Sequence, residues 1–217
     1  LIMIICLLVG YLAGIAMHRS DYCMAGMFRD FFLFKSVFML RTLVLLVLSS
    51  MILFEGARLI GILALYPFPL LYAPTPANII GGTLFGLGMV LAGGCVVGTL
   101  YKMGAGSILS TMTFAGLILG SFFYAEIHPW WTVFIKSTTF FTGRITLPQI
   151  LGVSPFVLIF PVAALGVFLV LRWKDQGKLV RQSAAEGYLQ PWKAALLLSV
   201  FGLASYVLIG MPLGITS

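Results

Sequence analysis

The sequence has very few charged residues: Lys, Arg, Asp and Glu together make up 9% of its 217 positions. Soluble domains carry roughly a quarter of such residues, so this scarcity excludes an ordinary water-soluble fold. Apolar residues make up 61% of the chain, and the mean hydropathy is +1.11. We therefore expect a protein of the lipid bilayer. Because its cations lie in short loops between apolar runs, the net charge of +7 does not indicate a nucleic-acid partner.

The sequence motifs of several enzyme classes are also missing. The chain contains no His-Glu-x-x-His metal motif, no nucleophile elbow and no Gly-x-x-x-x-Gly-Lys-Ser/Thr phosphate-binding loop. Its three cysteines form no Cys-x-x-Cys pair and show no metal-ligand spacing, which argues against a thiol oxidase and against a metal site. We expect no enzyme activity, no cofactor and no bound metal.

Long apolar runs are what the sequence does contain. They cover residues 1–17, 41–66, 79–93, 104–125, 153–171 and 192–210. A transmembrane helix needs about 20 residues, so run 79–93 is short and predicts a half-helix or re-entrant segment. Residues 22–38 predict a second short, broken element. The expected fold class is an all-α, polytopic transmembrane helix bundle with short broken or re-entrant helices and pseudo-symmetric repeats.

The distribution of Lys and Arg predicts how these runs cross the membrane. If the runs alternate in direction, ten of the thirteen cations fall on one side, which we expect to be cytoplasmic. These ten are Arg19, Arg29, Lys35, Arg41, Lys102, Arg172, Lys174, Lys178, Arg181 and Lys193. The other side holds Arg58, Lys136 and Arg144, and we place residues 126–152 there as an external segment.

A glycine-dense stretch at residues 81–106 surrounds Cys95. Each glycine weakens a helix, so this density predicts close backbone packing or a helix break. In a membrane, a broken helix is tolerated where it lines a polar pathway. We expect such a break at Gly93, Gly94 and Cys95.

A second segment repeats the pattern of this one. In both, a cysteine is followed by Gly at the third position and by a cation six or seven residues after the cysteine. Broken helices direct backbone N–H groups and a positive dipole end toward anions, and thiols suit sulfur-containing ligands. The candidate substrate-binding residues are Cys95, Cys23, Gly93, Gly94, Gly98 and Gly26, and the candidates for anion attraction are Arg19, Arg29 and Lys102.

Structural interpretations compete with these functional ones. A free cysteine is often a small buried hydrophobe, which is the interpretation we prefer for Cys6. Glu55 and Arg58 are three residues apart and are expected to pair on one helix face. Four charged residues near the first run can instead set the topology and pair with one another: Arg19, Asp21, Arg29 and Asp30.

At these residues the chain resembles the YeeE/YedE family of bacterial inner-membrane proteins, a sulfur-transport family that includes thiosulfate uptake transporters. The resemblance rests on residues 19–30 (RSDYCMAGMFRD), on the Gly-Gly-Cys block at 81–99, and on residues 210–217 (GMPLGITS). It implies a transporter built from two repeats, with short helices meeting in the middle of the membrane. It also implies that cysteines at the constriction pass thiosulfate across by successive S–H···S contacts. Cys23 and Cys95 match those thiols, and Cys6 matches nothing.

The chain departs from the family pattern at its end. The family has a second Gly-Gly-Cys block downstream of a Gly-Ile-Thr-Ser segment, and this sequence stops at that segment. We therefore expect a fragment rather than a homodimer, or a second polypeptide that completes the pathway. Residues 1–171 are then the first transmembrane repeat, 172–190 a cytoplasmic linker, and 191–217 the start of a truncated second repeat.

The leading functional hypothesis is an inner-membrane permease for a small sulfur-containing anion, with thiosulfate implied by the resemblance. One alternative is a permease for a selenium compound, which the same soft thiols would bind. Another is a membrane thiol subunit that relays sulfane sulfur to a cytosolic sulfur-carrier protein, and a third is a scaffold subunit. The expected partners are the anion, the lipid bilayer, such a carrier, and a second half-transporter or a second copy of the chain.

Overall fold

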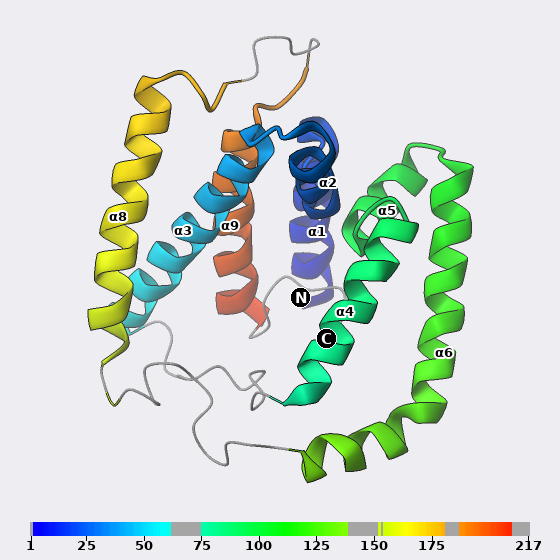
Figure 1. Ribbon diagram of the computed structural model, residues 1–217. Coiled ribbons are helices and arrows are strands. Elements are labelled where there is room, and N and C mark those ends of the chain that lie inside the picture. The colour runs from blue at the N-terminus through cyan, green and yellow to red at the C-terminus, as the bar shows by residue number, and fades with distance from the viewer. Residues whose placement is uncertain (1, 62–74, 139–151, 153, 181–186, 210–217) are drawn as a thin grey trace. The chain divides into compact units, whose positions relative to one another are not determined.

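The computed structural model describes residues 2–61, 75–138, 152, 154–180 and 187–209 (Figure 1). These residues form helices and connecting turns, and none of them lies in a strand. Six helical stretches among them are long and apolar enough to cross a membrane, so the predicted all-α polytopic fold is confirmed. The helices are α1 (Ile2–Ser20), α2 (Met24–Phe34), α3 (Phe38–Leu59), α4 (Pro76–Leu91), α5 (Val96–Gly104), α6 (Ile108–Ser137), α8 (Pro155–Asp175) and α9 (Pro191–Ile209).

Two of the six stretches are interrupted helices. One combines α1 and α2 across residues 21–23, and the other combines α4 and α5 across residues 92–95. With 16 residues, α4 is about 24 Å long, which is less than the roughly 30 Å hydrocarbon core of a bilayer. The short, broken elements predicted from the sequence are therefore present at both places.

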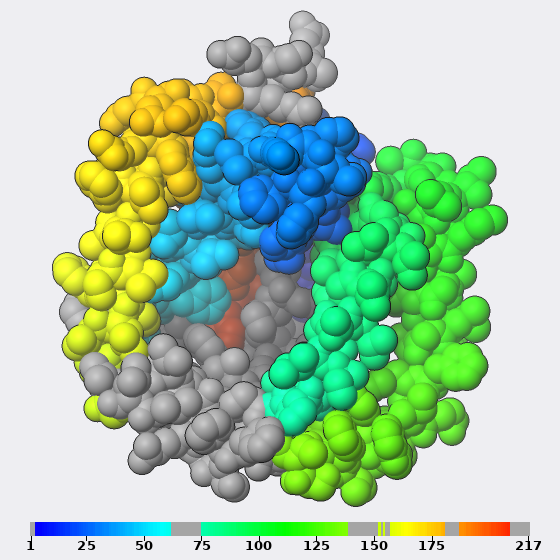
Figure 2. All heavy atoms as spheres, viewed as in Figure 1, coloured from blue at the N-terminus to red at the C-terminus, as the bar shows by residue number. Residues whose placement is uncertain are grey.

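The chain divides into two compact units. Unit 1 comprises residues 1–64 and 156–217, and unit 2 comprises residues 65–155. In unit 1, α9 packs against α3 and α1, and α2 packs against α3. Figure 2 shows the atoms of α2 and of the first turns of α3 as one continuous surface. In unit 2, α5 packs against α6, which α4 also contacts.

The core of unit 1 forms around the α1–α2 break. Tyr22 belongs to the break, and its ring is buried in a cluster with residues of α2, α3 and α9: Met27, Leu45, Ala194 and Ala195. The Tyr22 hydroxyl donates a hydrogen bond to the carbonyl oxygen of Thr42 on α3, at 3.1 Å. Packing and hydrogen bonding together fix this break to its neighbouring helices.

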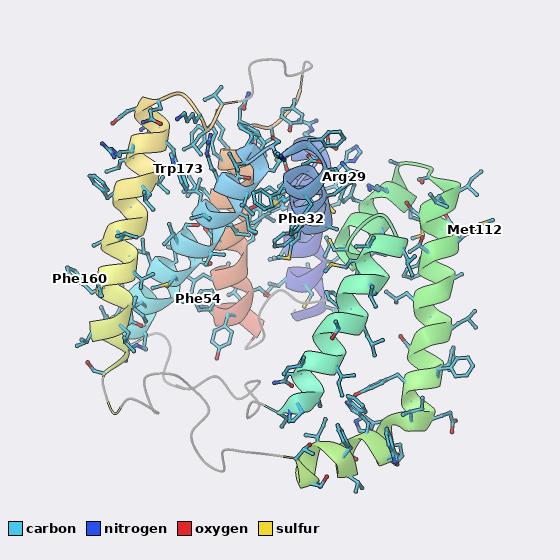
Figure 3. All side chains as sticks on the ribbon, viewed as in Figure 1. Arg29, Phe32, Phe54, Met112, Phe160 and Trp173 are labelled. Atoms are coloured by element: carbon cyan, nitrogen blue, oxygen red, sulfur yellow. The ribbon has the colours of Figure 1, made fainter. Side chains whose placement is uncertain are left out.

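Large apolar side chains cover the outer faces of several helices. In Figure 3, Phe160 of α8 and Met112 of α6 point away from the neighbouring helices, and they are 62% and 68% exposed. Such faces suit contact with lipid tails, which are as apolar as the side chains themselves. Cys6 also lies exposed on α1, so the expectation that it is buried is wrong.

The ion pair predicted on α3 is present. Arg58 Nε donates to Glu55 Oε2 at 2.9 Å, and Arg58 Nη2 contacts Glu55 Oε1. Glu55 is buried, and an ionised carboxylate in that position is costly unless a cation accompanies it. The pair therefore neutralises a charge within an apolar helix.

Helix α6 continues beyond the predicted end of its apolar run at residue 125 and ends at Ser137. The residues predicted as the start of an external segment are therefore helical. Pro129 lies inside the helix, and Figure 1 shows α6 changing direction in its last turns. Proline causes such bends because it removes a backbone N–H and its ring clashes with the preceding turn. Residues 139–151, the rest of that segment, lie outside the described residues.

Helix α8 also extends beyond the predicted end of its apolar run, since it ends at Asp175 rather than at residue 171. The first residues of the predicted linker are therefore helical. Residues 181–186 of this linker and residues 210–217, with the Gly-Ile-Thr-Ser segment, lie outside the described residues. The division into a first repeat, a linker and a second repeat stays a prediction.

One glycine of unit 1 permits close helix packing. A Cβ on Gly166 of α8 would overlap Leu48 Cδ2 and lie 3.0 Å from Leu48 Cγ, on α3. We expect Gly166→Ala to destabilise the protein by about 1–3 kcal/mol through overpacking. The measurement is thermal unfolding of the detergent-purified protein.

The matched control is Gly202→Ala on α9, where a Cβ would meet open space. This variant should unfold at the same or a higher temperature, because Ala favours a helix over Gly. Shortening Leu48 to Ala in the Gly166→Ala background should relieve the clash. Equal unfolding temperatures for both single variants would contradict close packing at Gly166.

Candidate functional site

Backbone hydrogen bonds close the break between α1 and α2. Asp21 adopts a left-handed conformation with φ of +50°, and the Tyr22 N–H donates to the Met17 carbonyl oxygen at 3.2 Å. This is the Schellman pattern that commonly ends helices, and Asp is among the few residues that tolerate its left-handed position. Cys23 follows in an extended conformation as the N-cap of α2.

Residues from a distant part of the sequence satisfy the last carbonyl groups of α1. The Leu189 N–H donates to the Arg19 carbonyl oxygen at 2.8 Å, and the Tyr188 hydroxyl donates to the Ser20 carbonyl oxygen at 3.0 Å. Terminal carbonyl groups need such partners wherever water is scarce. Tyr188 and Leu189 could not be predicted from sequence patterns, because their contacts with α1 join residues about 170 positions apart.

Helix α4 ends in the same way as α1. Gly93 has φ of +64°, its N–H donates to Val90, and the Gly94 N–H donates to Met89, each at 3.2 Å. These two bonds complete a Schellman motif with glycine at the left-handed position. Cys95 follows in an extended conformation as the N-cap of α5. In both breaks, the cysteine comes two residues after the left-handed residue and begins a short helix.

The Cys95 side chain caps α5. Its Sγ accepts a hydrogen bond from the Gly98 N–H at 3.3 Å, and its carbonyl oxygen accepts from the Thr99 N–H at 2.8 Å and from the Thr99 hydroxyl at 3.1 Å. Cys95 is half-buried, whereas Gly98 and Thr99 are buried. The thiol thus lies at the positive end of a helix, where negative charge is favoured. Thr99 could not be predicted from sequence patterns, because one Thr in a short helix forms no recurring pattern.

Cys23 has a different environment. It is 6% exposed, and its side chain does not cap α2. Its carbonyl oxygen accepts the first hydrogen bond of that helix, from the Met27 N–H at 3.0 Å. A Cβ on Gly26 would lie 3.7 Å from the Cys23 Cβ. The Cys-x-x-Gly spacing therefore places a glycine beside the cysteine in both copies.

The three candidate cations differ in their surroundings. Arg29 donates through Nε and Nη2 to Asp30 Oδ1, at 3.2 and 3.0 Å, and its side chain lies exposed on α2 (Figure 3). The expected pairing of Arg29 with Asp30 is therefore present. Arg19 lines an open groove of about 370 Å³ between α1 and α9. Lys102 Nζ donates to the Gly93 carbonyl oxygen at 3.2 Å, so its ammonium group lies at the α4–α5 break.

The predicted site residues therefore form two local groups. One contains Gly93, Gly94, Cys95, Gly98 and Lys102 in unit 2, and the other contains Cys23 and Gly26 in unit 1. Within the described residues, no group of three or more His, Cys, Asp and Glu side chains could hold a metal ion. What each break offers is a thiol beside a helix N-terminus, an arrangement suited to a small anion with a soft atom.

Comparison with known proteins finds related sequences. A family model described as sulphur transport matches residues 19–217. The thiosulfate transporter TsuA of Spirochaeta thermophila is 36% identical over 173 residues, which cover 73% of this chain and 51% of that protein. The thiosulfate transporter TsuA of Escherichia coli is 36% identical over 107 residues, covering 47% of this chain and 28% of that protein. The probable transporter YedE of Escherichia coli is 25% identical over 172 residues, covering 78% and 41%. The chain thus spans about half the length, or less, of these relatives.

The different burial of the two cysteines predicts different reactivity. In single-cysteine variants that keep only Cys95 or only Cys23, we expect a small thiol reagent to modify Cys95 several times faster. Reactivity follows exposure, and Cys95 is half-buried whereas Cys23 is buried. The measurement is the rate of mass increase by intact-protein mass spectrometry. After unfolding in detergent and urea, the two rates should become similar, whereas faster modification of Cys23 in the folded protein would contradict this geometry.

Proposed function

This chain belongs to the sulphur transport family, and we propose that it forms part of a permease for a small sulfur-containing anion, with thiosulfate as the first candidate. The chain is a multi-pass membrane protein with six apolar helical stretches. Two of its relatives are thiosulfate transporters, each 36% identical over the matched residues. The chain spans about half of the Spirochaeta thermophila protein. We therefore also propose that the complete protein transports the anion and that it lies in the bacterial inner membrane.

The observation that carries this proposal is the pair of broken spans, each with a cysteine as the N-cap of its second helix. A break in a membrane helix is costly, and it is tolerated where it serves a polar pathway. The helix N-terminus favours the negative charge of the anion, and the thiol offers a polarisable contact for its sulfur atom. Neither feature is needed by a helix that only crosses the bilayer.

Each predicted residue has a role in this proposal. The sulfur atom of the anion contacts the Cys95 thiol at one stage and the Cys23 thiol at another. Gly93 permits the left-handed turn that places Cys95, and Gly98 donates its N–H to the thiol. The remaining candidates act around these contacts: Gly26 and Gly94 leave space beside them, and Arg19, Arg29 and Lys102 attract the anion.

Transport of an intact anion breaks no covalent bond, so the proposal requires no cofactor and no enzyme activity. The other parts of the pathway come from the rest of a longer protein or from a second copy of the chain. A cytosolic sulfur-carrier protein is a suitable partner after transport, where its thiolate would take the sulfane sulfur of thiosulfate as a persulfide and release sulfite. Transport of a selenium compound is the alternative that the same thiols support.

The test is uptake of radiolabelled thiosulfate by bacterial cells that depend on the complete protein containing this chain. We expect Cys95→Ala to lower uptake about ten-fold or more, because the variant lacks the thiol contact. Cys23→Ala should lower it as well. Cys6→Ala is the matched control and should retain full uptake, since Cys6 lies exposed on α1 outside both breaks.

Two results would contradict the proposal. Unchanged uptake in the Cys95→Ala variant, with normal amounts of protein in the membrane, would exclude the thiol contact. Inhibition of thiosulfate uptake by selenite or selenide at much lower concentrations than unlabelled thiosulfate would favour the selenium permease instead.

A further inference from the structure

The ammonium group of Lys102 lies at the α4–α5 break rather than at the end of its own helix. Lys102 belongs to the last turn of α5, where a cation ordinarily stabilises the C-terminal end of the helix dipole. Its Nζ instead reaches back to the carbonyl oxygen of Gly93, nine residues earlier, at 3.2 Å. The side chain therefore brings a positive charge to the turn that holds Cys95.

No carboxylate neutralises this charge within the described residues. Glu126 is the single acidic residue in the sequence of unit 2, and it lies 18 residues beyond Ile108, about 27 Å along α6. Lys102 is half-buried, in a stretch apolar enough to cross the membrane. Arg29, by contrast, is paired with Asp30. The Lys102–Gly93 contact is exposed, so the ammonium is accessible, and with no carboxylate beside it among the described residues it is available to an anionic ligand.

The donors of Lys102 are only partly used. An ammonium group has three N–H donors, and among the described residues the Gly93 carbonyl oxygen takes one of them. This hydrogen bond positions the ammonium at the break and leaves two donors for another acceptor. A ligand with several oxygen atoms on one centre matches such a set.

Gly94 leaves a space beside this ammonium. A Cβ on Gly94 would lie 3.7 Å from Lys102 Nζ, and 3.9 Å from both the N and the Oγ1 of Thr99. These are ordinary van der Waals contacts, and the φ of Gly94 is not left-handed, so Ala fits there without strain. A methyl group would occupy a position bordered by an ammonium, an amide and a hydroxyl group.

We propose that Lys102 binds the oxygen end of the transported anion and that Gly94 keeps the approach to its ammonium group open, while Cys95 contacts the sulfur end. This inference rests on the proposed function and narrows the substrate class. The site selects anions that carry a terminal sulfur atom and several negatively charged oxygen atoms on one centre, such as thiosulfate. Anions without the oxygen end, such as hydrosulfide, cannot contact Cys95 through one end and Lys102 through the other, so they bind this site more weakly.

The test is the concentration dependence of radiolabelled thiosulfate uptake by the complete protein. Lys102→Gln should raise the KM about ten-fold or more, the loss expected for a charge-assisted hydrogen bond, with little change in maximal rate. Lys102→Arg keeps the charge and should restore most of the affinity. Lys136→Gln removes the charge of another Lys of unit 2, on α6, and should leave the KM unchanged.

Gly94→Ala provides an independent variant in which Lys102 is retained. It should raise the KM several-fold while the unfolding temperature stays the same, because the methyl group fits but covers the ammonium. If Lys102→Gln does not accumulate in the membrane, Lys102→Arg and Gly94→Ala decide the question. If Lys102 only supports the turn, its substitution should lower the amount of transporter in the membrane or the maximal rate of uptake and leave the KM unchanged.

The outcomes separate this inference from the proposed function. Absence of thiosulfate uptake by the wild-type protein would overturn both. Uptake that depends on Cys95 but keeps its KM in Lys102→Gln, or in Gly94→Ala, would overturn the role of Lys102 and leave the permease intact.

Discussion

In the interior of a bilayer, each backbone group that a helix break releases must find a partner in the protein, because water is not available there. The rest of this structure depends on how that constraint is met. At the α1–α2 break, Asp21 takes the left-handed position and the Tyr22 N–H closes the turn. Tyr188 and Leu189 satisfy the carbonyl groups of Ser20 and Arg19.

At the α4–α5 break, the same constraint is met within a short segment. Gly93 takes the left-handed position, and Lys102 donates to its carbonyl oxygen. Closing a break in this way also fixes the position of the residue two places after the left-handed residue, and that residue is a cysteine in both breaks. Each thiol is thereby held where a new helix begins. The demands of backbone hydrogen bonding and the position of the reactive sulfur atom are thus linked.

The two breaks differ in what surrounds the thiol. Cys23 adjoins Tyr22, which is packed in the core of unit 1, and the cation that follows it, Arg29, is paired with Asp30. Cys95 is half-buried and shares its turn with Lys102, which no carboxylate neutralises among the described residues. This difference is the physical basis for assigning charge recognition to the Cys95 break.

Sequence patterns predicted the elements that depend on local chemistry. Helix breaks at Cys23 and Cys95 followed from short apolar runs and from glycine density, and the Glu55–Arg58 pair followed from spacing on one helix face. The Cys-x-x-Gly spacing also indicated which glycines lie beside the thiols. These predictions succeeded because each rests on residues that are close together in the sequence.

Features that depend on the surroundings of a residue could not be predicted in this way. The apolar run was expected to end at residue 125, yet α6 continues to Ser137, because the proline at position 129 bends the helix without ending it. Cys6 was expected to be buried, but its side chain lies exposed on α1 in the described part of the chain. The contact of Lys102 with Gly93 depends on how the chain turns at the break, which residue spacing alone does not specify.

The most direct test of the central claim is an experimental structure of the complete protein with bound selenosulfate, in which anomalous scattering locates the selenium atom. Selenosulfate carries the oxygen end of thiosulfate and replaces its terminal sulfur by selenium. Binding at the break predicts a selenium peak in van der Waals contact with Cys95 Sγ, at about 3.5–4 Å, and oxygen atoms near Lys102 Nζ. A bound anion that contacts neither Cys95 nor Cys23 would contradict this account.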